Sequence, residues 1–156
     1  MLHFHARCAR RAGFTLIELL LALVILGVLA AIALPSYNQY LYRAKVAQAV
    51  NDIAAMNLQL RNYLTENHVA APDMSAIGAA GKLDPWGNAY LYANLAVVGI
   101  GGARKDKNLV PINTDFDLYS MGADGVTKKP LTTKDARDDV ILANDGKFIG
   151  LASDYE

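Results

Sequence analysis

A single carboxylate interrupts a long apolar segment near the start of this 156-residue chain. The segment runs from Phe14 to Leu34 as FTLIELLLALVILGVLAAIAL, and Glu18 is its only charged residue. A charge at the centre of a bilayer costs roughly 2.5–3.5 kcal/mol on insertion scales, so Glu18 needs a partner. A cut between Gly13 and Phe14 would create an α-amino group about one helical turn before Glu18. The amine and the carboxylate could then pair, within one chain or between neighbours, and keep packed helices in register.

A second group of acids lies in the C-terminal third of the chain. The stretch DFDLYSMGADG starts at Asp115, and Asp138 and Asp139 follow it. It is not an EF-hand loop, because Tyr119 and Ser120 stand where that loop needs an acid and a glycine. Carboxylate and carbonyl oxygens are nevertheless the ligands that calcium prefers, and one ion could fix a loop that no disulfide closes. The alternative is a solvated loop in which the acids pair with nearby bases, namely Lys128, Lys129, Lys134 and Arg137.

The composition argues against an enzyme. The only cysteine is Cys8, and His68 is the only histidine after His5. A catalytic triad would have to use His68, and a cysteine–histidine zinc site cannot form without further cysteines. Bases and acids balance at 15 each. Because the first 13 residues hold three arginines and no acid, the remainder has 12 bases against 15 acids, and nucleic acid is an unlikely partner.

The apolar segment has three interpretations. As a helix it is about 31 Å long, roughly the thickness of a hydrocarbon core. It could be an ordinary signal peptide with a small-residue cleavage site at Ala31–Ala33, or a plain membrane anchor. Both leave Glu18 unexplained, whereas cleavage after Gly13 gives it a partner. In each case the arginines at positions 7, 10 and 11 should stay in the cytoplasm, and the rest of the chain should face outward.

The helical pattern continues beyond Pro35, which should bend the helix rather than end it. Apolar residues recur at spacings of three and four and form one face: Val46, Val50, Ile53, Met56, Leu60 and Leu64. Asn67 and Pro72 mark the expected end, so one helix of roughly 50 residues is predicted. Three tyrosines after the apolar segment are typical either of a membrane-interface belt or of packing between subunits: Tyr37, Tyr40 and Tyr42.

The remaining sequence predicts a small antiparallel sheet. Residues 68–89 are expected to form a loop with a turn at DPWGN, and Trp86 should anchor this loop on the helix. The glycines of Gly99–Gly102 predict a flexible loop. Strands are expected at Ala89–Val98, Asp115–Ser120, Asp139–Ala143 and Lys147–Leu151, with a hairpin turn at Asn144–Gly146 between the last two. The fold class is therefore α+β, with a long N-terminal helix on the sheet.

The stretch GFTLIELLLALVILGVLAAIALPSY, from Gly13 to Tyr37, resembles the type IV prepilin signature of type IV pilins and type II secretion pseudopilins. The resemblance implies the pilin fold. It also implies that prepilin peptidase cuts between Gly13 and Phe14 and that Phe14 is then N-methylated. Glu18 would be the acid that aids subunit docking, and Pro35 the proline that bends the helix.

The head resembles the major pseudopilin of type II secretion. The matching residues are DPWGNAY from Asp84, then Asp117, Tyr119, Ser120, Gly122, Asp124 and Gly125, then Asp138-Asp139-Val140. The resemblance implies a calcium ion held by acidic side chains and main-chain carbonyls. The implied ligands are Ser120, Met121 through its carbonyl, Asp124, Asp138 and Asp139. The sequence VTKKPLTTKDAR departs from the family's glycine-rich spacer, and ALPSYNQYLYRAKVAQAV is more similar to type IV pilins.

These observations predict a leader over residues 1–13, a transmembrane and polymerisation segment over 14–35, and a head over 36–156. The expected function is that of a type II secretion pseudopilus subunit, with a type IV pilin as the alternative. A secreted calcium-binding or enzymatic domain behind a signal peptide is a further alternative. Expected partners are further copies of the chain, prepilin peptidase, an inner-membrane assembly platform, minor pilins or pseudopilins, and lipid before assembly. The chain should cross the inner membrane once, with its head in the periplasm, before joining a pseudopilus or an extracellular pilus.

Overall fold

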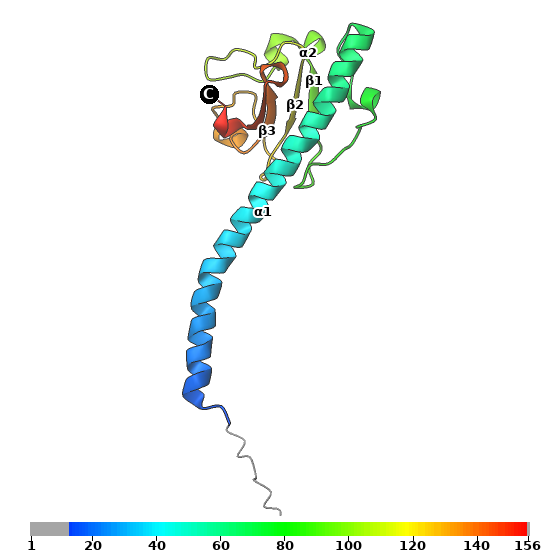
Figure 1. Cartoon of the computed structure of the whole chain (residues 1–156). Coiled ribbons are helices and arrows are strands. Elements are labelled where there is room, and N and C mark those ends of the chain that lie inside the picture. Colours follow the sequence, from blue (N-terminus) through cyan, green and yellow to red (C-terminus); the bar gives the residue numbers. More distant parts are fainter. Residues whose placement is uncertain (1–12, 156) are drawn as a thin grey trace, which may run out of the picture. The chain divides into compact units, whose positions relative to one another are not determined.

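The computed structural model describes residues 13–155. Its helices and strands are α1 (Leu16–Asn67), β1 (Leu91–Asn94), α2 (Leu95–Gly102), β2 (Phe116–Ser120), β3 (Val140–Ala143) and β4 (Phe148–Leu151), joined by loops and 3₁₀ turns (Figure 1). The chain divides into two compact units, Met1–Tyr40 and Leu41–Glu156. The predicted leader, with Cys8 and its arginines, lies outside the described residues except for Gly13. The α+β class with a long N-terminal helix and an antiparallel sheet is confirmed.

The first unit contains the apolar part of α1. Every residue from Leu16 to Leu34 is exposed, and none of the most apolar window, whose mean hydropathy is 2.9, is buried in the chain. By length and composition α1 is therefore able to cross a membrane. Pro35 lies inside the helix, although it lacks the N–H that would bond to the preceding turn. The single predicted helix is confirmed at 52 residues, and the bend near Pro35 stays a prediction.

In the second unit, one face of α1 forms much of the core. Its fully buried residues follow helical spacing: Ala49, Ile53, Met56 and Leu60. Val46 and Val50 pack against the same cluster, so the predicted apolar face is confirmed for most of its length, while Leu64 is half-buried. The helix ends at Asn67, and His68 adopts a left-handed φ of 60° while donating its N–H to Leu64 O at 2.9 Å.

The sheet of the second unit is an antiparallel meander in the order β1-β2-β3-β4. Side chains of β3 alternate between two apolar clusters. Val140 and Leu142 join the cluster that contains α1, whereas Ile141 and Ala143 join a second cluster formed with the C-terminal loops. The sheet is thus covered on both faces, by α1 on one and by loop segments on the other. Three of the four predicted strands, which correspond to β2, β3 and β4, are confirmed within one residue at each end.

The prediction for the region from residue 89 to 102 is wrong in two respects. The expected strand Ala89–Val98 is shortened to β1, and the expected flexible loop Gly99–Gly102 is part of α2. The switch occurs at Asn94, whose side chain accepts the N–H of Ala96 at 3.0 Å and caps the new helix. Gly99 kinks α2 with a φ of 66°, a conformation that glycine adopts without strain.

Two local predictions for the head are confirmed. Asn144–Gly146 connects β3 to β4 as a tight turn, with φ values of 50° at Asn144 and 95° at Gly146. Trp86 is half-buried and packs on Tyr42 of α1, with the ring centroids 6.1 Å apart. The loop is therefore tied to the helix as expected. Tyr42 is engaged within the head, whereas Tyr37 and Tyr40 are exposed.

Gly122 and Gly78 give a matched test of how closely the β2–β3 loop packs. Both glycines have φ near 65–68°, but a Cβ at Gly122 would collide with the Asp138 carbonyl, whereas a Cβ at Gly78 meets nothing within 4 Å. We expect Gly78→Ala to lower the melting temperature by roughly 5 °C through backbone strain, and Gly122→Ala by roughly 10 °C or more. Fluorescence of Trp86, the only tryptophan, follows unfolding of the head. Equal losses for the two variants would contradict the close approach of Gly122 to Asp138.

Candidate functional site

Gly13 and Phe14 lie in non-helical backbone immediately before α1. Phe14 is 83% exposed, and a Cβ added at Gly13 would meet nothing within 4 Å. The fold itself therefore gives no reason for glycine at position 13. The bond between the two residues is accessible, as a protease substrate must be, so the requirement for glycine would come from the enzyme.

Glu18 is held at the start of α1 by Thr15. Its Oε2 accepts the Thr15 N–H and the Thr15 hydroxyl, both at 2.8 Å, and the Glu18 N–H donates to Thr15 Oγ1 at 3.3 Å. This is a capping box, in which a threonine and the acid three residues later satisfy each other's backbone groups. The carboxylate is thereby fixed one turn from Phe14, and its pairing with a Phe14 amine stays a prediction.

In the head, the DPWGN turn and the β2 strand form one hydrogen-bonded unit. Asp84 Oδ1 accepts the N–H groups of Trp86 at 3.0 Å and Asn88 at 2.8 Å, while its Oδ2 accepts the Ser120 hydroxyl. Asn88 Nδ2 in turn donates to Gly122 O at 3.1 Å. Asp84 and Ser120 are both buried, so a direct hydrogen bond inside the head joins two segments more than thirty residues apart in sequence.

Apart from Asp139, three of the five predicted calcium ligands have side-chain oxygens that already accept hydrogen bonds from backbone donors, namely Ser120, Asp124 and Asp138. Ser120 Oγ donates to Asp84 and accepts the Gly122 N–H at 3.0 Å. Asp138 Oδ2 accepts two successive N–H groups, at 2.9 and 3.2 Å, from residues 123 and 124. Asp124 Oδ1 accepts the N–H of residue 126 at 2.8 Å. Met121, the predicted carbonyl ligand, is half-buried.

Asp139, the fifth predicted ligand, is fully buried against a cation that the sequence analysis did not single out. Its Oδ2 lies 2.5 Å from Nη2 of Arg104, which is 3% exposed. Burial raises the pKa of the Asp139 carboxyl, and the charge of Arg104 opposes that rise. Asp139 Oδ1 and Arg104 Nε have no hydrogen-bond partner within the described residues.

The ligand set does not fit a calcium ion. Calcium takes six to eight oxygen ligands, mainly carboxylates and carbonyls. Within residues 13–155, no three acidic, histidine or cysteine side chains form a group able to hold a metal. Asp139 Oδ1 is a buried oxygen without a hydrogen-bond donor within the described residues, but it stands beside a guanidinium that repels a cation. One lysine pair of the kind that the alternative predicts is present, between Lys128 Nζ and Asp135 Oδ2 at 3.1 Å, whereas Lys129 Nζ donates to Gly101 O.

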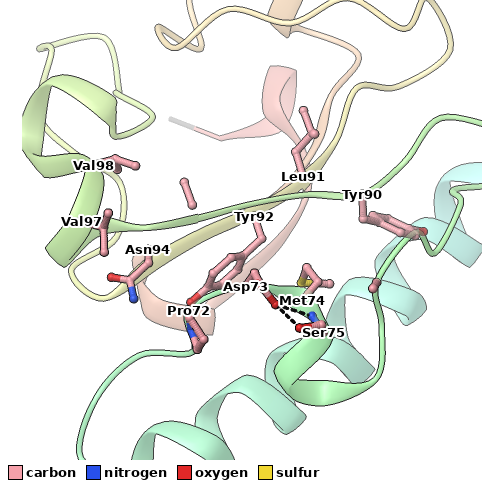
Figure 2. A pocket seen from close by; sticks show the side chains of 12 residues that line it. Pro72, Asp73, Met74, Ser75, Tyr90, Leu91, Tyr92, Asn94, Val97 and Val98 are labelled. Atoms are coloured by element: carbon pink, nitrogen blue, oxygen red, sulfur yellow. Dashed lines mark hydrogen bonds between the residues drawn. The ribbon is translucent and has the colours of Figure 1, made fainter.

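A groove of the head lies between β1, α2 and the segment after α1 (Figure 2). Its volume is about 450 Å³, and its walls include Pro72, Met74, Tyr92 and Val97. Asp73 accepts hydrogen bonds from Ser75, which lower the pKa of its carboxyl, and burial raises the pKa of the Tyr92 phenol to about 12. Neither group is suited to act as a general base at neutral pH, and the residues lining the groove include no histidine or cysteine.

Comparison with known proteins identifies the N-terminal segment. A family model described as the prokaryotic N-terminal methylation motif matches residues 8–34. Type II secretion system core protein G of Pseudomonas aeruginosa is 31% identical over 137 residues, which cover 74% of this chain and 86% of that protein. The chain belongs to the type IV prepilin family. No solved structure gives a significant match.

Other relatives of this prepilin are pilins. Fimbrial protein EcpC of Eikenella corrodens is 35% identical over 87% of this chain and 78% of its own length. Type IV major pilin protein PilE of Neisseria gonorrhoeae is 30% identical over 87% of each chain. These relatives are structural subunits rather than enzymes, as the lack of a catalytic set in the sequence predicted. Membership of the family implies a membrane-anchored subunit that polymerises into filaments.

Two parts of the site were missed from the sequence. Thr15 was treated only as a polar interruption, although its spacing to Glu18 is that of a capping box. Arg104 carries no local signal, because its partner Asp139 lies 35 residues later.

Asp84 and Asp106 allow the link between the two head motifs to be tested. Each carboxylate accepts the N–H groups two and four residues later, but only Asp84 also accepts a buried hydroxyl from another segment. We expect Asp84→Asn to lower the melting temperature of the prepilin by roughly 5–10 °C, and Asp106→Asn by roughly 2 °C or less. Similar losses in thermal unfolding would show that the bond to Ser120 adds nothing.

Proposed function

We propose that this chain is a subunit of a type II secretion pseudopilus, of the major pseudopilin kind. The observation that carries the proposal is the contact between DPWGN and the DFDLYSMGADG stretch, through Asp84 with Ser120 and Asn88 with Gly122. The head resembles the major pseudopilin in these two motifs, and they form one structural unit. Core protein G of Pseudomonas aeruginosa and that of Escherichia coli K12 are each 31% identical to the chain.

Each step of the proposed pathway acts on the N-terminal segment. The apolar part of α1 inserts into the inner membrane with the basic leader in the cytoplasm and the head in the periplasm. Prepilin peptidase cuts after Gly13 and methylates Phe14, both of which are accessible. An inner-membrane platform and minor subunits then receive the helix, and the filament that grows pushes exported proteins outward.

A type IV pilin is the second candidate, because the pilin relatives cover 87% of the chain and core protein G covers 74%. The two functions are separated in a strain that lacks this chain. A pseudopilus subunit is needed for release of exported proteins into the medium, while surface filaments remain. Loss of surface filaments or of twitching, with protein export intact, would favour the pilin and overturn the first proposal.

Processing gives the first prediction for this function. We expect the mature protein to be residues 14–156 with a methylated α-amine, as measured by intact mass spectrometry. Gly13→Leu should leave the leader attached, because a bulky side chain blocks the peptidase. Gly27→Leu is the matched control, since a Cβ at either glycine meets nothing within 4 Å, and it should be cleaved normally. A chain that starts at Leu34 instead would indicate an ordinary signal peptide.

Assembly gives the second prediction. Glu18→Ala should still insert into membranes, because it removes a charge that bilayers disfavour. Its filament yield should fall at least about tenfold, because the Phe14 amine of a neighbouring subunit loses its partner. Glu18→Asp, one methylene shorter, should give an intermediate yield.

The matched control for assembly is Glu66→Ala, at an exposed position near the end of the same helix. It should leave the yield unchanged. Filaments are sheared from cells that overexpress the subunit, and their yield is measured by immunoblotting with membrane fractions as the loading reference. A normal yield from Glu18→Ala would rule out the pairing.

A further inference from the structure

The β2–β3 loop contains the acids that the resemblance assigns to calcium. The most buried of them, Asp139, already pairs with a cationic side chain of the same protein, Arg104. Asp139 is 0% exposed, and its Oδ2 accepts Nη2 of Arg104 and the hydroxyl of Thr127, each at 2.5 Å. Arg104 Nη1 donates to the same Thr127 hydroxyl oxygen at 2.7 Å. Thr127 belongs to the loop and Asp139 to its end, so one guanidinium contacts both.

Arg104 is itself fixed from several sides. Its backbone N–H donates to Asp117 Oδ2 at 2.7 Å, and Asp117 Oδ1 accepts Asn113 Nδ2 at 2.9 Å. The guanidinium carbon lies 4.1 Å from the centroid of the Tyr119 ring, within cation–π distance. Because Arg104 is only 3% exposed, these contacts hold a full positive charge in the interior. Arg104 therefore connects β2, the β2–β3 loop and Asp139, the residue before β3.

Two further acids of the loop, Asp124 and Asp138, are engaged by its backbone. Asp138 and Asp124 each use one carboxylate oxygen to accept backbone N–H groups of the loop. They do not approach Asp139 closely enough to form a three-acid group within residues 13–155. The positive charge of Arg104 contacts one oxygen of Asp139 and repels a divalent ion from the other.

We propose that the guanidinium of Arg104 replaces calcium as the cation that holds the β2–β3 loop of this chain. The loop is then held by a positive side chain of the protein itself, and the head folds independently of divalent ions. This inference rests on contacts within the head and holds for a pseudopilus subunit and for a type IV pilin alike.

The first test uses the processed, detergent-solubilised protein and melting followed by Trp86 fluorescence. We expect the same melting temperature in millimolar calcium and in chelator, and no heat of binding when calcium is titrated by calorimetry. Because the Arg104–Asp139 pair is buried, the melting temperatures in calcium and in chelator should stay equal when salt is added. A rise in melting temperature with calcium overturns the proposal, since a ligand that binds the folded state must stabilise it.

The second test measures the coupling between Arg104 and Asp139. Arg104→Gln and Asp139→Asn should each lower the melting temperature by roughly 10 °C or more, because each leaves one buried charge unpaired. The double variant should lose clearly less than the sum of the two single losses. Arg137→Gln is the matched control, because Arg137 is exposed in the same loop and makes no ion pair within residues 13–155, and it should melt like the parent.

Additive losses in the double variant would show that the two residues act separately, and would overturn the proposal. If a single variant fails to fold, the calcium and chelator measurements on the parent protein still decide between the guanidinium and the metal.

Discussion

The helix α1 must satisfy two different environments, and most of the structure depends on how its apolar residues are distributed. Up to Leu34 they are exposed all round the helix, whereas from Ala49 to Leu60 they form one buried stripe against the sheet. A helix that is apolar all round is stable only in lipid or among other helices. The stripe, by contrast, supplies the core on which β2 and β3 fold. The same helix thus serves as membrane segment and as core of the head.

The head is closed by polar side chains as well as by apolar packing. Asp52 of α1 accepts Lys82 and Tyr90 from the segment after the helix, and Arg61 of α1 pairs with Asp115 at 2.8 Å. Exposed or half-exposed pairs of this kind contribute little each. The buried groups Asp84, Asp117 and Asp139 matter more, because removal of one partner leaves a desolvated charge. Their hydrogen bonds fix long loops in a chain whose single cysteine cannot form an internal disulfide.

Local patterns in the sequence were sufficient for the elements that local physics determines. Helical spacing predicted α1 and its buried face, and the Asn144–Gly146 turn predicted the pairing of β3 with β4. The helix α2 was missed because it has no buried residue and depends on the cap at Asn94. Arg104 was missed because its partners Asp117 and Asp139 lie 13 and 35 positions away in the sequence, and only the folded head brings them together. The role of Thr15 could have been predicted from the sequence, since capping boxes have a fixed spacing.

The exposed apolar part of α1 bears on why a subunit would leave the membrane for a filament. Lipid tails are as apolar as leucine, so exchanging lipid for neighbouring helices yields no hydrophobic free energy. Close packing of side chains between helices gives part of the driving force. In the proposed filament the charge of Glu18 supplies the rest of the driving force. In lipid its carboxylate is hydrogen-bonded by Thr15 of its own chain, whereas in the filament a neighbouring subunit adds a cationic amine. In that filament a residue that is unfavourable for membrane insertion would make assembly selective, since only a helix docked in the correct register would satisfy it.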